Sequence, residues 1–362
     1  MSTVTIAPST FTSPDFPRNA WYAAAWDTEV KRQLLPRTIC GKNLVFYRKA
    51  NGECAALEDA CWHRLLPLSK GRLDGDEVVC GYHGLVYNAQ GRCVYMPSQE
   101  TINPSACVRS YPVAEKHRFV WIWVGDPALA NPECVPDLHW NHDPQWAGDG
   151  RTIHAKCNYK LVLDNLMDLT HETFVHGSSI GNRAVAEAPF AVSHGTNTAT
   201  VTRWMLNIDP PPFWARQLGK PGKVDRWQII RFEAPSTIAI DVGVAPAGSG
   251  APEGDRSHGV NGYVLNTVTP ETDSTCHYFW AFARNYRIGE QSITTELCEG
   301  VAQIFREDER ILEAQQLAID ENPGRTFYNL NIDAGAMWMR RLIDEMIRAE
   351  SNANQETAYA VL

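Results

Sequence analysis

Short apolar runs separated by turn residues characterise the first third of the chain. The run over residues 118–124 is the strongest of them, and Gly125-Asp126-Pro127 closes it. Short runs bounded by turn signals are typical of antiparallel strands, so this part of the chain predicts a small antiparallel β domain. The strand candidates are residues 37–48, 54–58, 85–87, 92–95 and 118–124.

The pattern changes twice in the rest of the chain. Residues 129–150 are rich in Pro, Asp, Asn and Trp, show little periodicity, and predict a linker. Helical spacing then appears over residues 158–175, 296–319 and 335–350. Between these helices lie strand candidates at residues 199–206, 225–232, 237–244, 262–268 and 275–284. The whole predicts an α+β protein with a disordered tail (1–16), a small β domain (17–128), the linker, and a helix-flanked antiparallel-sheet domain (151–362).

Composition narrows the class of protein. The chain has 362 residues, 44% hydrophobic and 21% charged, which is typical of a soluble globular protein of two domains. A net charge of −9 argues against nucleic acid as a partner, and no apolar run reaches membrane-spanning length. The ten cysteines show no disulfide framework, and the start of the chain lacks a signal-peptide pattern. We therefore expect a cytoplasmic location with reduced thiols.

The chain shows no dinucleotide fingerprint. The nearest string, residues 248–254, has the wrong glycine spacing and reads as a loop. We expect that the chain binds neither NAD nor flavin, and that its electrons come from another protein.

Two tight cysteine–histidine motifs carry the first candidate chemistry. Cys61 and His63 form one, and Cys80 and His83 form the other. A Rieske [2Fe–2S] cluster needs two thiolates on one iron and two imidazoles on the other, and one ligand of each kind per motif supplies them. Zinc is the alternative, although zinc motifs usually pair like ligands.

A second candidate metal site lies in the predicted sheet domain. His171 and His176 are five residues apart, so they resemble H-E-x-x-H only superficially, and the helix must widen or end between them to let both reach one metal. Mononuclear non-haem iron wants two histidines and one carboxylate. Asp308 lies on the apolar stripe of the helix at 296–319, whereas Glu307 and Glu309 fall away from it. A buried Asp–Arg pair is the alternative for Asp308.

Together these motifs resemble those of Rieske non-haem iron oxygenases, among them oxygenase components similar to vanillate O-demethylase, dicamba monooxygenase and toluenesulfonate methyl-monooxygenase. The resemblance runs from Arg18 to about Glu350. It implies that residues 17–128 form the Rieske [2Fe–2S] domain and residues 151–362 the catalytic domain with Fe(II). The chain departs from the family pattern by carrying bulky residues around the first motif. These are Trp62, Leu65 and Leu66.

The resemblance also implies roles for other residues. Asp168 corresponds to an aspartate that bridges a cluster histidine of a neighbouring subunit to an iron ligand; orienting His171 is the alternative. Asn165 matches a neighbour of the site, with capping or packing as the alternative. Asp241 and Asn266 match substrate contacts of relatives, and ordinary strand positions are equally compatible with them. Arg203, Arg226 and Arg231 are the arginines available to an acidic substrate.

The activity that the resemblance implies is that of a terminal monooxygenase. The expected reaction is O-demethylation of a methoxybenzoate with O2 and release of formaldehyde. Methyl hydroxylation or ring dihydroxylation of an aromatic carboxylate or sulfonate is one alternative, and an electron-transfer protein without catalytic iron is another; a zinc-binding structural protein is a third. The implied partners are a separate reductase, with or without a ferredoxin, and two further copies of the chain in a trimer.

Overall fold

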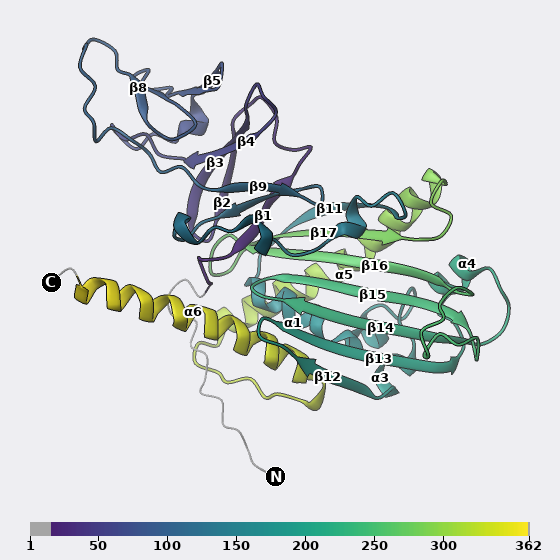
Figure 1. Ribbon diagram of the computed structural model, residues 1–362. Coiled ribbons are helices and arrows are strands. Elements are labelled where there is room, and N and C mark those ends of the chain that lie inside the picture. Colours follow the sequence, from purple (N-terminus) through teal and green to yellow (C-terminus); the bar gives the residue numbers. More distant parts are fainter. Residues whose placement is uncertain (1–15, 361–362) are drawn as a thin grey trace. The chain divides into compact units, whose positions relative to one another are not determined.

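The structure, a computed structural model, describes residues 16–360 (Figure 1). It divides into two compact units. The smaller comprises Phe16–Asp137 and Thr269–Thr272, and the larger comprises Leu138–Val268 and residues 273–360. The tail predicted at residues 1–16 lies outside the described residues except for Phe16, whose side chain is buried. Within the described residues, no helix combines the length and the apolar character that crossing a bilayer requires.

The smaller unit consists of three small antiparallel sheets, as the short apolar runs predicted. Their strand orders are β1-β10-β9, β2-β3-β4 and β5-β6-β7-β8. The strand bounds are β1 Trp21–Trp26, β2 Leu35–Ile39, β3 Lys42–Arg48, β4 Cys54–Glu58, β5 Arg72–Asp74, β6 Glu77–Val79, β7 Val86–Tyr87, β8 Cys93–Tyr95, β9 Val113–Lys116 and β10 Phe119–Trp123.

One strand prediction in this unit is wrong. Residues 37–48 were expected to form a single strand, but the chain turns back at Cys40 and Gly41, both with positive φ, and β2 pairs with β3 as a hairpin. Glycine takes this left-handed backbone without steric cost, so Gly41 marks the turn.

The larger unit is built on a seven-stranded sheet in the order β11-β17-β16-β15-β14-β13-β12 (Figure 1). Its strands are β11 Ala147–Ala155, β12 Phe190–His194, β13 Thr198–Ile208, β14 Val224–Glu233, β15 Thr237–Pro246, β16 Val260–Pro270 and β17 Cys276–Arg284. The helices are α1 Tyr159–Met167, α2 Glu172–Val175, α3 Arg183–Glu187, α4 Pro212–Leu218, α5 Gln291–Glu321 and α6 Ala334–Ala360. Helix α1 contacts both α5 and α6, and all three pack on the sheet. The chain is therefore α+β, as predicted.

Three boundaries differ from the sequence expectation. The segment 129–150, expected to link the domains, contains the 3-10 helices Pro132–Cys134 and His139–Asn141 and the first residues of β11. The helix expected over residues 158–175 ends at Met167, because Asp168 adopts an extended backbone. The last two long helices, α5 and α6, both extend beyond the ranges predicted for them.

Candidate active site

The break after α1 sets the position of both site histidines. The Asp168 carboxylate accepts a hydrogen bond from the Thr170 amide and starts a 3-10 turn, Leu169–His171, which leads into the single turn of α2. His176 ends α2 with a non-helical backbone (φ −111°, ψ 26°). The helix end that the five-residue spacing required is therefore present, and it lies at His176. Because α1 ends at Met167 and a 3-10 turn carries His171, Asp168 and His171 do not share a face of one α-helix.

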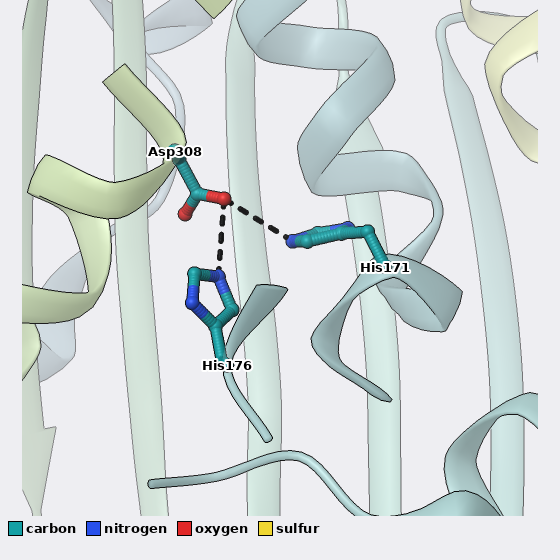
Figure 2. Close-up of side chains that lie close together, drawn as sticks. All are labelled: His171, His176 and Asp308. Atoms are coloured by element: carbon teal, nitrogen blue, oxygen red, sulfur yellow. Dashed lines mark hydrogen bonds and ion pairs between the residues drawn. The ribbon is translucent and has the colours of Figure 1, made fainter. Parts of the chain in front are cut away.

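The third side chain comes from α5. Asp308 is 5% exposed and lies among the buried residues of the apolar stripe, as its spacing predicted. Its Oδ1 lies 3.0 Å from Nε2 of His176 and 3.4 Å from Nε2 of His171 (Figure 2). Two ligand atoms at right angles, each about 2.1 Å from a metal ion, lie about 3.0 Å apart, so this spacing suits a shared ion.

Each imidazole is oriented by a second hydrogen bond on its other nitrogen. Nδ1 of His171 lies 2.7 Å from the main-chain carbonyl of Asp168, and Nδ1 of His176 lies 2.7 Å from Oε2 of Glu307. A carbonyl and a carboxylate can only accept, so both Nδ1 atoms donate. In the neutral imidazoles, both Nε2 atoms then present a lone pair toward the same place.

The pKa shifts of His171, His176 and Asp308 indicate that a positive charge between these side chains is favourable. Burial lowers the pKa of both imidazoles, but the hydrogen bonds and charge of Asp308 outweigh it and hold the pKa of His171 and His176 above the ordinary value. Burial raises the pKa of the Asp308 carboxyl, yet the two imidazoles bring it below its usual range. A divalent cation satisfies the same carboxylate while leaving both imidazoles neutral. The donor set of two imidazoles and one carboxylate fits mononuclear iron.

Glu307 lies off the apolar stripe of α5, as its spacing predicted, yet it takes part in the site, which the spacing did not reveal. Its side chain, 29% exposed, reaches sideways from α5 to His176. We expect Glu307→Ala to weaken iron binding by about 10- to 100-fold, because partners that orient a ligand imidazole contribute that much to metal affinity. Iron content measured against a graded chelator checks this. Glu309→Ala, on the same helix but not bonded to His176, is the matched control and should bind iron like the parent. Equal affinities in both variants would contradict the role of Glu307.

The two cysteine–histidine motifs of the smaller unit form two loops with one hydrogen-bond pattern. In the first, the Cys61 amide donates to the Leu66 carbonyl and the Leu65 amide to the Cys61 carbonyl. In the second, the Cys80 amide donates to the Leu85 carbonyl and the Gly84 amide to the Cys80 carbonyl. The loops span residues 61–66 and 80–85, and in both the fifth residue adopts a left-handed backbone. It is Gly84 in the second and Leu65 in the first, where a side chain makes that backbone cost roughly 1–2 kcal/mol.

The four side chains of these loops form two pairs. Nδ1 of His63 lies 3.2 Å from Nδ1 of His83, with both rings exposed, while the sulfurs of Cys61 and Cys80 are buried and interact with each other. Among residues 16–352, the set that gathers three ligand atoms around one point is His171, His176 and Asp308, not these four. A tetrahedral zinc ion needs such convergence, whereas a two-iron cluster needs two pairs.

Hydrogen bonds to sulfur accompany the thiol pair. The Tyr87 hydroxyl lies 3.2 Å from the Cys61 sulfur. Burial raises the pKa of the Cys80 thiol, and backbone N–H groups of Tyr82 and His83 act in the opposite direction. Donors of this kind stabilise cluster sulfurs. The bulky residues noted in the sequence mostly face solvent: Trp62 is 41% and Leu65 73% exposed, while Leu66 packs partly on the core.

The histidine–aspartate site opens on a cavity between the sheet and the helices of the larger unit. Its wall is mainly apolar, from Phe213 and Trp214 of α4 to Val301 and Phe305 of α5. Strands β14 and β15 supply alternate residues and β16 and β17 one residue each, so one face of the sheet forms the floor. Its polar lining is Asn165, His171, Glu172, His176, Arg226, Gln228 and Asp308.

The other predicted residues are distributed unevenly around this cavity. Asn165 lines it, and its amide nitrogen lies 3.2 Å from Oδ1 of Asp308. The Asp168 carboxylate faces Arg203 at 3.6 Å. Asp241 accepts hydrogen bonds from Trp227 and Asn261 and pairs with Arg256, and Asn266 is fully buried against Tyr278. Within the described residues, neither Asp241 nor Asn266 belongs to the cavity lining.

The lining also contains three buried residues that the predicted site did not include: Glu172, Arg226 and Gln228. Arg226 had been considered only as a contact for an acidic substrate. Glu172 is 5% exposed and accepts hydrogen bonds from Arg226 and Gln228 of β14, each at 2.9 Å. These pairs join positions more than 50 residues apart. The one signal in the sequence is the presence of Arg226 and Gln228 two residues apart on a strand, which places both on one face.

Comparisons with known proteins match both parts of the chain. The family described as the Rieske [2Fe-2S] domain matches residues 20–112, and the family described as the vanillate O-demethylase oxygenase C-terminal domain matches residues 155–349. The chain is 42% identical to a vanillate O-demethylase oxygenase subunit of a Pseudomonas species (96% of this chain, 98% of the relative). It is 41% identical to the iron–sulfur subunit of a toluene-4-sulfonate monooxygenase system of Comamonas testosteroni (93% and 98%). A crystal structure of dicamba monooxygenase bound to 3,6-dichlorosalicylic acid superposes with a TM-score of 0.87 at 34% identity, covering 92% of this chain and 98% of that one.

Proposed function

Because this chain belongs to the Rieske non-haem iron oxygenases of the vanillate O-demethylase type, we propose that it removes the methyl group of a methoxybenzoate, with O2 as oxidant and formaldehyde as product. It is the oxygenase component of such a system and contains a Rieske [2Fe–2S] cluster and mononuclear iron. Per turnover, the methoxyarene, O2, two electrons and two protons become a phenol, formaldehyde and water.

The observation that carries this proposal is the convergence of His171, His176 and Asp308 on the wall of a mainly apolar cavity. An apolar cavity with few polar groups suits an aromatic ring and excludes water. Mononuclear iron held there would supply the activation of O2. The chain's own groups hold the ligands in place: the carbonyl of Asp168 and the carboxylate of Glu307 keep both imidazoles turned toward the site.

The cluster would be held by the paired loops, with Cys61 and Cys80 on one iron and His63 and His83 on the other. The exposed imidazoles leave the histidine end of the cluster open to an electron partner. The relatives are named as oxygenase subunits or components, which supports a separate reductase for this chain. A homotrimer in the cytoplasm, with the Asp168 carboxylate linking a neighbour's cluster to His171, completes the proposal.

Product analysis tests the reaction. The purified chain, a reductase and NADH are incubated with 3-methoxybenzoates, and formaldehyde, O2 and substrate are measured together. We expect one formaldehyde per substrate consumed and per O2 used. A hydroxymethyl product from a methylarene without demethylase activity would favour methyl hydroxylation, which the toluene-4-sulfonate relative makes the second candidate. A cis-diol product would indicate ring dihydroxylation.

A further inference from the structure

The segment 168–176, which carries both site histidines, is fastened to the sheet at two places. At the first, Glu172 accepts hydrogen bonds from Arg226 and Gln228 of β14, each at 2.9 Å. The second place is one strand away, at Arg203 of β13. Arg203 lies directly opposite Gln228 in the register, so both side chains are on the same face of the sheet. Side chains from two neighbouring strands therefore hold this segment.

Arg203 is buried, and its guanidinium faces the turn that carries His171. The residue is 4% exposed, and its Nη2 donates to the Thr170 hydroxyl at 3.1 Å. The same nitrogen lies 3.6 Å from Oδ1 of Asp168. From the neighbouring strand β12, the ring of Phe190 packs against the guanidinium, with the ring centroid 5.5 Å from Cζ. The guanidinium is thus confined between an aromatic ring and the turn.

Arg203 is not part of the cavity wall. Within the described residues, the lining of the cavity includes Arg226 but neither Arg203 nor Thr170. The sequence left Arg203 as one of three arginines available to an acidic substrate, whereas the structure places it behind the turn. A substitution of Arg203 therefore changes what supports the turn without removing a group from the cavity.

The turn that Arg203 contacts sets the direction of His171. Nδ1 of His171 donates to the main-chain carbonyl of Asp168, and Thr170 lies between these two residues in the chain. The turn is a single 3-10 turn, Leu169–His171, after the end of α1, and so short a helical piece is marginal by itself. A bond from a buried guanidinium to the hydroxyl in its middle limits how far the turn, and His171 with it, can move.

We propose that Arg203 is a positioning residue for the iron site. It holds the turn against β13 through Thr170, and so keeps Nε2 of His171 directed at Asp308. It is neither a ligand nor a substrate contact. This inference rests on the proposed function for the identity of the metal at the site, and it adds a residue on which the geometry of that site depends.

Positioning and simple electrostatics predict opposite effects on iron affinity. Arg203 carries a positive charge, and a positive charge near a cation site repels the cation. If charge alone mattered, Arg203→Met would bind Fe²⁺ more tightly than the parent. If Arg203 positions His171, the same substitution should bind Fe²⁺ about 10-fold more weakly, because groups that orient a ligand contribute about that much to metal affinity.

The test measures the iron affinity of the holoenzyme against a graded chelator. For Arg203→Met we expect the 10-fold loss together with the cluster absorption and the substrate KM of the parent, since no group of the cavity wall is removed. Arg203→Lys keeps the charge and one donor but not the forked guanidinium, so it should lose about threefold. Arg341→Met, at an exposed arginine of α6 that pairs with Glu345, is the control and should keep the parent's affinity.

Thr170→Val tests the route by which Arg203 acts. Valine keeps the branched shape of threonine and removes the hydroxyl that receives the bond from Arg203. We expect Thr170→Val to weaken iron binding by about threefold to 10-fold. The double variant, Arg203→Met with Thr170→Val, should bind iron no more weakly than Arg203→Met alone, because both substitutions remove the same contact.

Each outcome decides the inference separately from the proposed function. Tighter or unchanged iron binding in Arg203→Met overturns it, as does a raised KM without a change in iron affinity. Losses that multiply in the double variant also overturn it. If Arg203→Met does not fold, Thr170→Val decides, and the parent's affinity in that variant overturns the inference. These results refute the role of Arg203 alone, whereas iron retained in His171→Ala would refute the metal site on which the proposed function depends.

Discussion

His171→Ala should lose one iron per chain and all measurable product formation, while its cluster spectrum stays that of the parent. His171 offers one of three side-chain atoms that lie within 4.8 Å of one another, and the two remaining groups would hold an ion only weakly. The cluster lies in the other compact unit, on residues that the substitution does not touch. Iron and sulfide analysis, visible absorption and formaldehyde release measure the three quantities.

A control histidine separates this effect from a general one. His258→Ala changes an exposed residue of the same unit and should keep the parent's iron and activity. Unchanged iron content in His171→Ala would overturn the assignment of the metal site, and would favour an electron-transfer protein without catalytic iron.

Asp168→Asn should keep both metals and lower turnover by about 100-fold or more. The bond that orients His171 comes from the main-chain carbonyl of Asp168, which the substitution leaves in place. Asparagine can also still accept from the Thr170 amide, so the local turn is preserved. The variant therefore removes little except the negative charge beside Arg203. The rate of electron transfer from the reduced cluster to the mononuclear iron, measured in a single turnover, tests this directly.

Asp164→Asn is the matched control for charge in this region. Asp164 pairs with Arg340 rather than with a site residue, so its loss should leave the electron-transfer rate unchanged. Full activity in Asp168→Asn would rule out the proposed bridging role. Loss of iron in that variant would instead indicate that the carboxylate supports the position of His171.

The features that sequence predicted well are those encoded by close spacing. Cys61 and His63, and Cys80 and His83, lie on loops of six residues, so their grouping follows from local geometry. Asp308 was found through helical periodicity, because its neighbours on the stripe are apolar and the structure buries them all. The strands around residues 118–124 and 275–284 were also visible, since their flanks carry clear turn residues.

Other features depend on contacts between distant segments, which periodicity cannot show. Glu307 lies off the apolar stripe, and only the placement of α2 beside α5 lets it reach His176. The pairing of Glu172 with Arg226 spans 54 positions and requires the register of β14. The end of α1 at Asp168 was missed because the segment 158–175 keeps helical spacing throughout. There, the turn that Asp168 caps competes successfully with continuation of the helix.

The convergence of the Nε2 atoms of His171 and His176 on Asp308 has a consequence for how the protein is loaded with metal. A rigid trio of two imidazoles and a carboxylate ranks divalent ions by their intrinsic affinity, and Zn²⁺ and Co²⁺ stand above Fe²⁺ in that ranking. Nothing in such a trio rejects them by ligand chemistry. The occupancy of the site by iron therefore depends on which ions the cell or the growth medium supplies, and mismetallated molecules would retain a brown cluster while being inert.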